Sequence, residues 1–209
     1  MRTGRFITFE GGEGTGKSTQ ARRLRERLQE AGHEVVLTRE PGGSPGAEEI
    51  RALLVTGGAD RWSSMAETLL LYAARSDHLD RVIRPALERG AWVISDRFAD
   101  STRAYQGAAG GVSPALLSTL EDAVLGPDRP DLTLVMDLRA ETGLGRANSR
   151  GGAENRFESK AAEFHDRLGA AFLTIAESEP GRCVVIDAAH GADEVAEAVW
   201  AAVQARLSP

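Results

Sequence analysis

Residues 11–18 read Gly-Gly-Glu-Gly-Thr-Gly-Lys-Ser and match the phosphate-binding pattern G-x-x-x-x-G-K-[ST] at every fixed position. Glycine lacks the Cβ atom that hinders positive φ and close approach of the backbone to an anion. In this pattern Lys17 supplies a point charge for the β- and γ-phosphates, and Ser18 supplies a hydroxyl for Mg²⁺. The segment therefore predicts a nucleotide site with Mg²⁺, formed by Gly11, Gly12, Glu13, Gly14, Thr15, Gly16, Lys17, Ser18 and Thr19.

Charged residues also follow the apolar segment 91–95. Asp96 stands at the tip of this expected strand, where a carboxylate can hold Mg²⁺ opposite Ser18. The alternative for Asp96 is an aspartate that caps the following turn. Arg97 comes next, and its planar fork of donors suits the acceptor phosphate of a phosphoryl transfer.

Further arginines are candidates for the same chemistry. Arg51 and Arg75 lie on expected helices near the cleft, although an arginine on a helix is usually solvated. Arg146, Arg150 and Arg156 lie in and around the polar segment 148–155, which could act as a lid. From such a lid they could close over the phosphates of ATP and stabilise the transition state. The alternative, an ordinary solvated loop, is expected for at least one of the three.

Three other polar residues could contact the second substrate. Glu13 is unusual in a phosphate loop, because its charge would repel the nucleotide, so we expect it to point toward a hydroxyl of that substrate. Tyr105 and Gln106 pair an aromatic ring with a carboxamide, which can shape a base or sugar pocket. Spacing alone leaves open that Tyr105 belongs to the core.

The elements that must position these residues alternate along the chain. Short apolar runs predict strands at 5–10, 34–38, 91–95, 132–137 and 183–187. Helical patterns cover 17–31, 46–55, 64–89, 113–125, 140–148, 157–178 and 193–207, and Pro85 should kink or divide the third of them. This order predicts an α/β fold with a mainly parallel, five-stranded sheet flanked by helices. In such sheets ligands bind at the carboxyl ends of the strands, where the phosphate loop and Asp96 both lie.

Composition excludes several classes of protein. The net charge is −6 and no block of lysine or arginine occurs, which argues against a nucleic-acid coat or a membrane-surface protein. The single cysteine, Cys183, cannot form an internal disulfide and reads as a small core residue. With no signal-peptide pattern and no apolar run of membrane-spanning length, we expect a cytoplasmic protein.

Taken in order, the motifs resemble those of thymidylate kinases. The matching segments, which span nearly the whole chain, are Phe-Glu-Gly-Gly-Glu-Gly-Thr-Gly-Lys-Ser-Thr (9–19), Thr-Arg-Glu-Pro-Gly-Gly (38–43), Ala-Ala-Arg (73–75), Asp-Arg-Phe-Ala-Asp-Ser-Thr-Arg-Ala-Tyr-Gln-Gly (96–107) and Arg-Pro-Asp-Leu-Thr (129–133). The resemblance implies one nucleoside-monophosphate-kinase-like domain over residues 1–209, with the P-loop NTPase fold and a lid at about 146–158. It implies Mg²⁺-dependent transfer of the γ-phosphoryl group of ATP to dTMP.

The resemblance also assigns roles. It implies that Arg97 and Arg51 bind the thymidylate phosphate and that Arg75 donates to the thymine ring. Tyr105 would crowd the 2′ position and Glu13 would approach the 3′-hydroxyl. The remaining pocket residues would be Glu40, Pro41, Leu71, Thr102 and Gln106. Leu71 departs from the family, which usually has a phenylalanine that stacks on thymine at this position.

The arginines identify the bacterial lid-arginine kind, because the phosphate loop has none and the lid segment has several. Members are typically homodimers joined through helices, and the apolar helix around 64–76 would serve. Two alternatives remain: a kinase for another nucleoside or nucleoside monophosphate, and a nucleotide-binding switch. A GTPase switch would need an Asn-Lys-x-Asp segment, which the sequence lacks.

Overall fold

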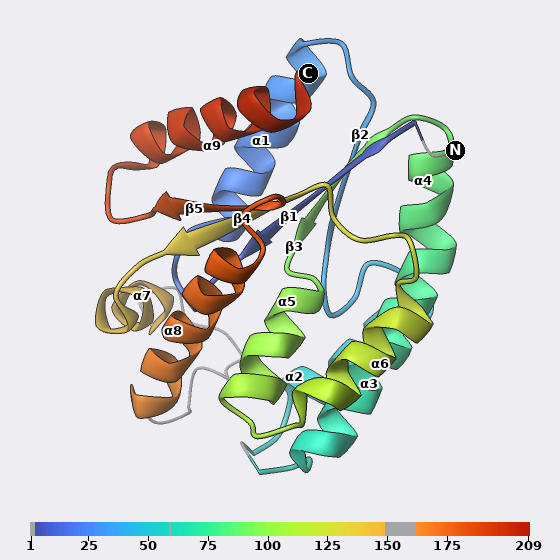
Figure 1. The fold of residues 1–209 in the computed structure, drawn as a ribbon, viewed down its shortest axis with the longest axis vertical. Coiled ribbons are helices and arrows are strands. Elements are labelled where there is room, and N and C mark those ends of the chain that lie inside the picture. The colour runs from blue at the N-terminus through green and yellow to red at the C-terminus, as the bar shows by residue number, and fades with distance from the viewer. Residues whose placement is uncertain (1–2, 59, 149–161) are drawn as a thin grey trace.

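A computed structural model gives the structure of the protein and describes residues 3–58, 60–148 and 162–209. Within these residues five strands form one sheet in the order β2-β3-β1-β4-β5, and every neighbouring pair is parallel (Figure 1). The strands are β1 (Arg5–Glu10), β2 (Val35–Arg39), β3 (Trp92–Asp96), β4 (Leu132–Asp137) and β5 (Cys183–Asp187). The predicted fold class is confirmed, and each strand lies within one residue of its predicted bounds.

The register of the sheet brings the chemistry-bearing strand ends together. In the central strand β1, Phe9 pairs with Asp96 of β3 on one side and with Leu134 of β4 on the other. The phosphate loop that follows β1 therefore starts beside the end of β3. Asp96 also pairs with Arg39 at the end of β2. Three strand ends thus meet at one edge of the sheet, as expected for parallel strands.

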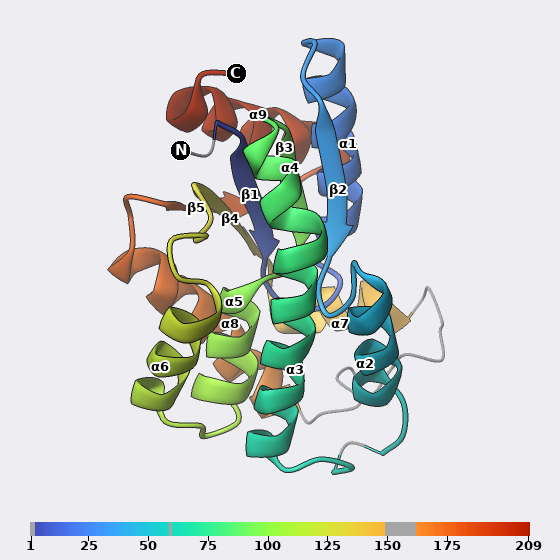
Figure 2. The same ribbon diagram turned by 90° about the vertical axis from the view of Figure 1, so that its right-hand side faces the viewer.

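Helices cover both faces of the sheet (Figures 1 and 2). One face is covered by α1 (Lys17–Glu30) and α9 (Ala192–Leu207), which pack on β1 and β4 through a shared apolar cluster. A second cluster joins β1 and β3 to α3 (Ser64–His78), α4 (Arg84–Glu88) and α6 (Pro114–Val124). A third joins β4 to α8 (Ala162–Ser178). Because both faces are covered, the inner strands are apolar along most of their length.

The helical pattern predicted at 64–89 is divided, as Pro85 indicated. A π-helical segment, η1 (Leu79–Ile83), separates α3 from α4, and Pro85 lies in the first turn of α4. Proline has no N–H to donate to the preceding turn, so the regular hydrogen-bond pattern changes just before it.

One helical segment was not predicted from the sequence. Residues 99–108 form α5 (Ala99–Thr102) followed by the π-helical segment η2 (Arg103–Ala108). This segment carries three predicted site residues, Thr102, Tyr105 and Gln106. The two remaining helices, α2 (Pro45–Val55) and α7 (Ala140–Asn148), agree with the predicted ranges.

Some predictions fall on residues that the structure does not describe. Most of the proposed lid at 146–158, including Arg150 and Arg156, lies outside the described residues. Cys183 is buried in β5, as predicted for a small core residue, and burial raises the pKa of its thiol to about 11. Among the helices of the described ranges, none has the length and apolar character needed to cross a membrane.

Candidate active site

A cavity of about 270 Å³ opens at the carboxyl ends of β1, β2 and β3. It is lined by all ten residues predicted to bind the second substrate and by Lys17, Ser18 and Asp96. In Figure 2 the arrowheads of β1 and β2 point toward this end of the sheet, where α2, α3, α5 and α7 lie. Residues from five separate sequence segments therefore surround one space. The predicted substrate residues are Glu13, Glu40, Pro41, Arg51, Leu71, Arg75, Arg97, Thr102, Tyr105 and Gln106.

The phosphate loop is curled around the lysine that follows it. Gly11, Gly14 and Gly16 have φ values of 132°, 67° and 91°, which other residues rarely adopt. Lys17 Nζ donates hydrogen bonds to the carbonyl oxygens of Gly11 (3.1 Å) and Gly12 (2.5 Å). Burial, with the neighbouring charge of Arg97, lowers the pKa of Lys17 to about 8. An incoming phosphate would restore the charge partner that this buried ammonium group needs.

Ser18 and Asp96, which were predicted to hold Mg²⁺, lie in contact with each other. The Ser18 hydroxyl donates a hydrogen bond to Asp96 Oδ2, although the two residues lie 78 positions apart. One hydroxyl and one carboxylate fit Mg²⁺, which prefers oxygen ligands and normally keeps water and phosphate oxygens in its remaining positions.

Arg97 occupies the junction between the phosphate loop and the second half of the cavity. Its backbone has a φ of 71°, which is uncommon for a residue with a side chain. Its guanidinium donates to the Gly11 carbonyl (3.0 Å), to the Ser101 hydroxyl (3.1 Å) and to Glu13 Oε1 (2.9 Å). Tyr105 also donates to Glu13 Oε1 (2.7 Å).

The charge of Glu13 is fixed by this arrangement. Burial alone would raise its pKa, but Arg97, Lys17 and the Tyr105 hydroxyl together lower the pKa to about 2. Glu13 is therefore ionised at neutral pH and faces the cavity between the phosphate loop and Tyr105.

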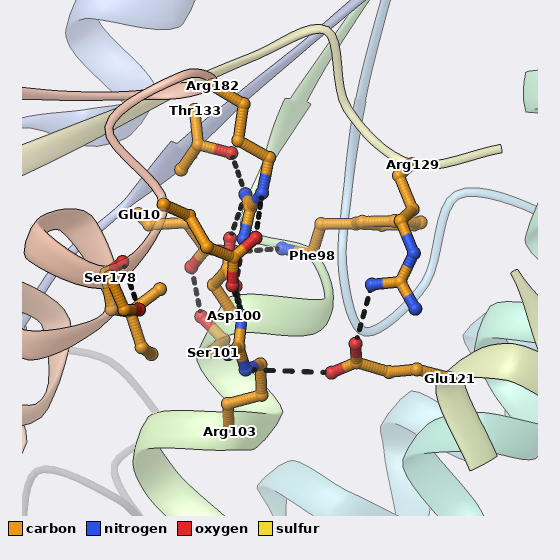
Figure 3. Close-up of polar contacts among 12 residues, drawn as sticks. Glu10, Phe98, Asp100, Ser101, Arg103, Glu121, Arg129, Thr133, Ser178 and Arg182 are labelled. Carbon is orange, nitrogen blue, oxygen red and sulfur yellow. Dashed lines mark hydrogen bonds and ion pairs between the residues drawn. The ribbon is translucent and has the colours of Figure 1, made fainter. Parts of the chain in front are cut away.

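Glu10, the last residue of β1, binds the segment that directly follows Arg97, through Phe98 and Ser101 (Figure 3). Glu10 accepts hydrogen bonds from the Phe98 N–H (2.8 Å) and from the Ser101 hydroxyl (2.5 Å). Its side chain is fully buried, and this burial, with the nearby charge of Asp100, raises its pKa to about 7. In turn Asp100 receives two hydrogen bonds from Arg182, at 2.7 and 2.9 Å.

Arg75 forms the far wall of the cavity and is only 2% exposed. It donates to Glu40 Oε2 (2.7 Å), to the Phe98 carbonyl (3.1 Å) and to the Thr102 hydroxyl (3.0 Å). Burial alone would lower the pKa of Arg75, but the carboxylate of Glu40 holds it above its ordinary value. Within the described part of the chain, its Nη1 atom has no hydrogen-bond partner although it is buried.

Leu71 and Tyr72 point in different directions from α3. Leu71 lines the cavity beside Val55, whereas Tyr72 is buried in the second core cluster with Phe6 and Leu79. The ring of Tyr72 lies under the guanidinium of Arg75, 4.8 Å from its centre. Tyr72 therefore does not take the place of the aromatic residue that the family usually has at position 71.

The remaining predicted arginines are placed less centrally. Arg51 lines the cavity and donates to the Pro41 carbonyl (2.7 Å). Arg146 is exposed, donates to the Ala188 carbonyl (3.2 Å) and does not line the cavity. Four residues of the predicted nucleotide site, Gly11, Gly12, Thr15 and Thr19, also lie outside its lining.

Several residues that build the site were missed from the sequence. Arg39, Phe98 and Ser101 line the cavity, and all three belong to the quoted motifs, which was the signal available for them. His78, for which no role was predicted, bridges Glu40 Oε1 (3.1 Å) and the Thr38 hydroxyl (2.7 Å). No local sequence pattern indicates that contact.

Comparisons with known proteins agree with this geometry. The family model described as thymidylate kinase matches residues 9–199. A thymidylate kinase of Caulobacter vibrioides is 62% identical over 207 residues, covering 99% of both chains. One from Bradyrhizobium sp. (strain ORS 278) is 54% identical over 206 residues, covering 98% of this chain and 91% of the relative. The crystal structure of thymidylate kinase from Ehrlichia chaffeensis superimposes with a TM-score of 0.78 at 35% identity, covering 96% of this chain and 99% of that one. As its motifs predicted, the chain belongs to the thymidylate kinase family.

Proposed function

We propose that this protein transfers the γ-phosphoryl group of ATP to dTMP and so produces ADP and dTDP. The observation that carries the proposal is the single cavity in which Lys17 and Ser18 of the phosphate loop meet Arg75 of α3, with Arg97 between them. A kinase needs its donor and acceptor held end to end in this way. The family membership supports the same reaction.

At the phosphate end, positive charge is concentrated where the two substrates would meet. An oxygen of the dTMP phosphate attacks the γ-phosphorus, a P–O bond forms, and the bond to the bridging oxygen of ADP breaks. Lys17 would contact the β- and γ-phosphates, while Arg97, with Arg51 behind it, would bind the acceptor phosphate. These cations offset the charge that develops in transfer between two anions. Mg²⁺ held near Ser18 and Asp96 would neutralise charge on the β- and γ-phosphate oxygens.

At the base end, Arg75 offers a donor whose orientation is fixed by Glu40, Phe98 and Thr102. Its buried Nη1, which has no partner among the residues described, supports a hydrogen bond to the O4 atom of thymine, because a buried donor without a partner is costly. Leu71 would pack on the base. Tyr105 and Glu13 would adjoin the sugar, the ring disfavouring a 2′-hydroxyl and the carboxylate facing the 3′-hydroxyl.

The lid arginines, the assembly and the location are proposed on the sequence alone. Arg150 and Arg156 would reach the phosphates from the lid at about 146–158, together with Arg146. We further propose a homodimer and a cytoplasmic location.

Initial rates of ADP formation with dTMP, dUMP, dCMP, dGMP and dAMP as acceptors test the proposal. We expect dTMP to be used with the highest kcat/KM, and we expect Lys17→Ala to lose most activity while keeping its circular dichroism spectrum. Comparable turnover of all five acceptors would favour the alternative, a kinase for another nucleoside monophosphate.

A further inference from the structure

The side-chain amide of Gln106 is held by a residue outside the cavity. Gln106 Nε2 donates a hydrogen bond of 2.7 Å to Glu67 Oε1. Gln106 lies in η2 and lines the cavity, whereas Glu67 lies in the first turn of α3 and does not. Both residues are buried: Gln106 is 3% exposed and Glu67 is 8% exposed.

This contact decides which end of the amide is available to a ligand. In this contact the NH₂ group of Gln106 donates to the carboxyl group of Glu67, and the carbonyl oxygen is the other end of the same amide. Gln106 Oε1 is then the free end. It is buried and has no hydrogen-bond partner among the residues that the structure describes.

A second unpartnered atom of opposite kind belongs to the same cavity wall. Arg75 Nη1 is likewise buried without a partner in the described ranges, and a guanidinium can only donate. Two residues of the cavity wall thus carry one acceptor and one donor that have no partner among the described residues. Thymine and uracil carry the matching edge, with N3–H as donor and O4 as acceptor. Cytosine carries the reverse at both positions, with N3 as acceptor and the 4-amino group as donor.

We propose that Glu67 is a positioning residue that sets base selectivity by fixing the Gln106 amide with its oxygen toward the substrate. This inference rests on the proposed function. Without the carboxylate, the amide can turn and offer its NH₂ group to N3 of cytosine. Glu67 does not line the cavity and contacts the lining residue Gln106, so its influence should appear in the choice of base and not in phosphoryl transfer itself.

The test compares kcat/KM for dTMP, dUMP and dCMP in the wild type and in Glu67→Gln, whose amide can pair with Gln106 in either orientation. We expect the dTMP-to-dCMP ratio to fall at least about tenfold, which corresponds to about 1.4 kcal/mol. The dTMP-to-dUMP ratio should stay within about twofold, because both bases present the same edge and would lose the same contact. A general structural defect would lower all three values together and leave both ratios unchanged.

Two further variants complete the experiment. Glu121→Gln alters another buried glutamate, one that is bound to Arg129, and should leave both ratios unchanged. Glu67→Ala removes the carboxylate without adding an amide, and it replaces Glu67→Gln if that variant does not fold. An unchanged dTMP-to-dCMP ratio in a folded Glu67 variant would overturn the inference. Failure of the wild type to phosphorylate dTMP would instead overturn the proposed function.

Discussion

The carboxyl group of Glu10 connects the end of β1 to the segment that carries Arg97. The buried surroundings of Glu10 disfavour its ionised form. It is fully buried, yet it accepts hydrogen bonds from Phe98 and Ser101. Because the pKa of Glu10 is raised to about 7, the folded protein holds its proton at a pH at which the unfolded chain has already lost it. We therefore expect Glu10 to make the stability of the protein depend on pH.

Between the ordinary pKa of 4.5 and the raised value of about 7, the unfolded state binds fewer protons at Glu10 than the folded state does. The free energy of unfolding of the wild type should therefore fall by up to ~3 kcal/mol relative to Glu10→Gln across this range, and stay constant above it. Urea denaturation of both proteins at pH 5, 6, 7 and 8 measures the difference. If the wild type keeps or gains stability relative to Glu10→Gln as the pH rises from 5 to 7, Glu10 is not the titrating group.

Leu71 should affect the affinity for dTMP, because it lines the cavity at a position where the family usually has an aromatic ring that stacks on the base. Replacing it with phenylalanine should strengthen dTMP binding by about 1 kcal/mol, or about fivefold in Kd, through stacking on the base. Calorimetric titration with dTMP checks this, with Leu53→Phe on exposed α2 surface as the control. Unchanged or weaker binding by Leu71→Phe would mean that the base does not lie against this side chain.

Among single residues, the sequence predicted those that belong to a local pattern. It missed residues whose contacts join distant parts of the chain. Lys17, Ser18 and Asp96 could be found because glycine spacing and a strand end mark them. Glu67 and His78 contact their partners Gln106 and Glu40 across 39 and 38 positions, and no spacing rule relates such pairs.

Helix α7 makes an unusually close contact with the phosphate loop. A Cβ atom at Gly143 would overlap the Glu13 carbonyl, and one at Gly14 would overlap the Gly143 carbonyl. The backbones of the helix and the loop therefore touch without side chains between them. The position of α7 should thus influence the shape of the phosphate loop.

Two glycines of α7 allow a matched test of this contact. Gly143→Ala should destabilise the protein by roughly 1–3 kcal/mol, because the added methyl group must displace backbone, and should also weaken ATP binding. At Gly145, an added Cβ meets no described atom within 4 Å outside the backbone of its own helix, so Gly145→Ala should be neutral or stabilising by up to ~1 kcal/mol through helix propensity. Thermal unfolding and nucleotide titration of both variants give the comparison. Equal stability and equal ATP affinity of the two variants would show that the contact between α7 and the phosphate loop has no such effect.

Among the helices, the periodicity of apolar residues was sufficient to predict those in which it continues over a long stretch, such as α1, α3 and α9. It failed for residues 99–108, where polar and small residues alternate without an apolar stripe. That helical segment is stabilised by long-range contacts instead, among them the hydrogen bonds of Asp100 with Arg182.

In the whole molecule, the strand order places β1, and the phosphate loop that follows it, at the centre of the sheet. Helix α3 lies between α2 and α6 in Figure 2. Met65 and Leu69, one helical turn apart on α3, are 44% and 51% exposed. A surface of this kind on a predicted interface helix fits the proposed homodimer.

Leu69→Glu should therefore shift the protein from dimer to monomer, because a charge at the centre of an apolar interface has no partner. Sedimentation velocity at micromolar concentration measures the change. Val185→Glu is the control, since Val185 is similarly exposed, at 45%, but lies on β5. A wild type that sediments as a monomer would contradict the homodimer itself.

A crystal structure with dTMP and a non-hydrolysable ATP analogue would show whether the two nucleotides lie end to end in one cavity. We predict the thymine ring against Leu71 with O4 near Arg75 Nη1, the dTMP phosphate on Arg97, and the γ-phosphate on Lys17 in line with that phosphate. A dTMP molecule bound away from Arg75, or phosphates that do not meet at Arg97, would show that the cavity does not hold the two substrates in this way.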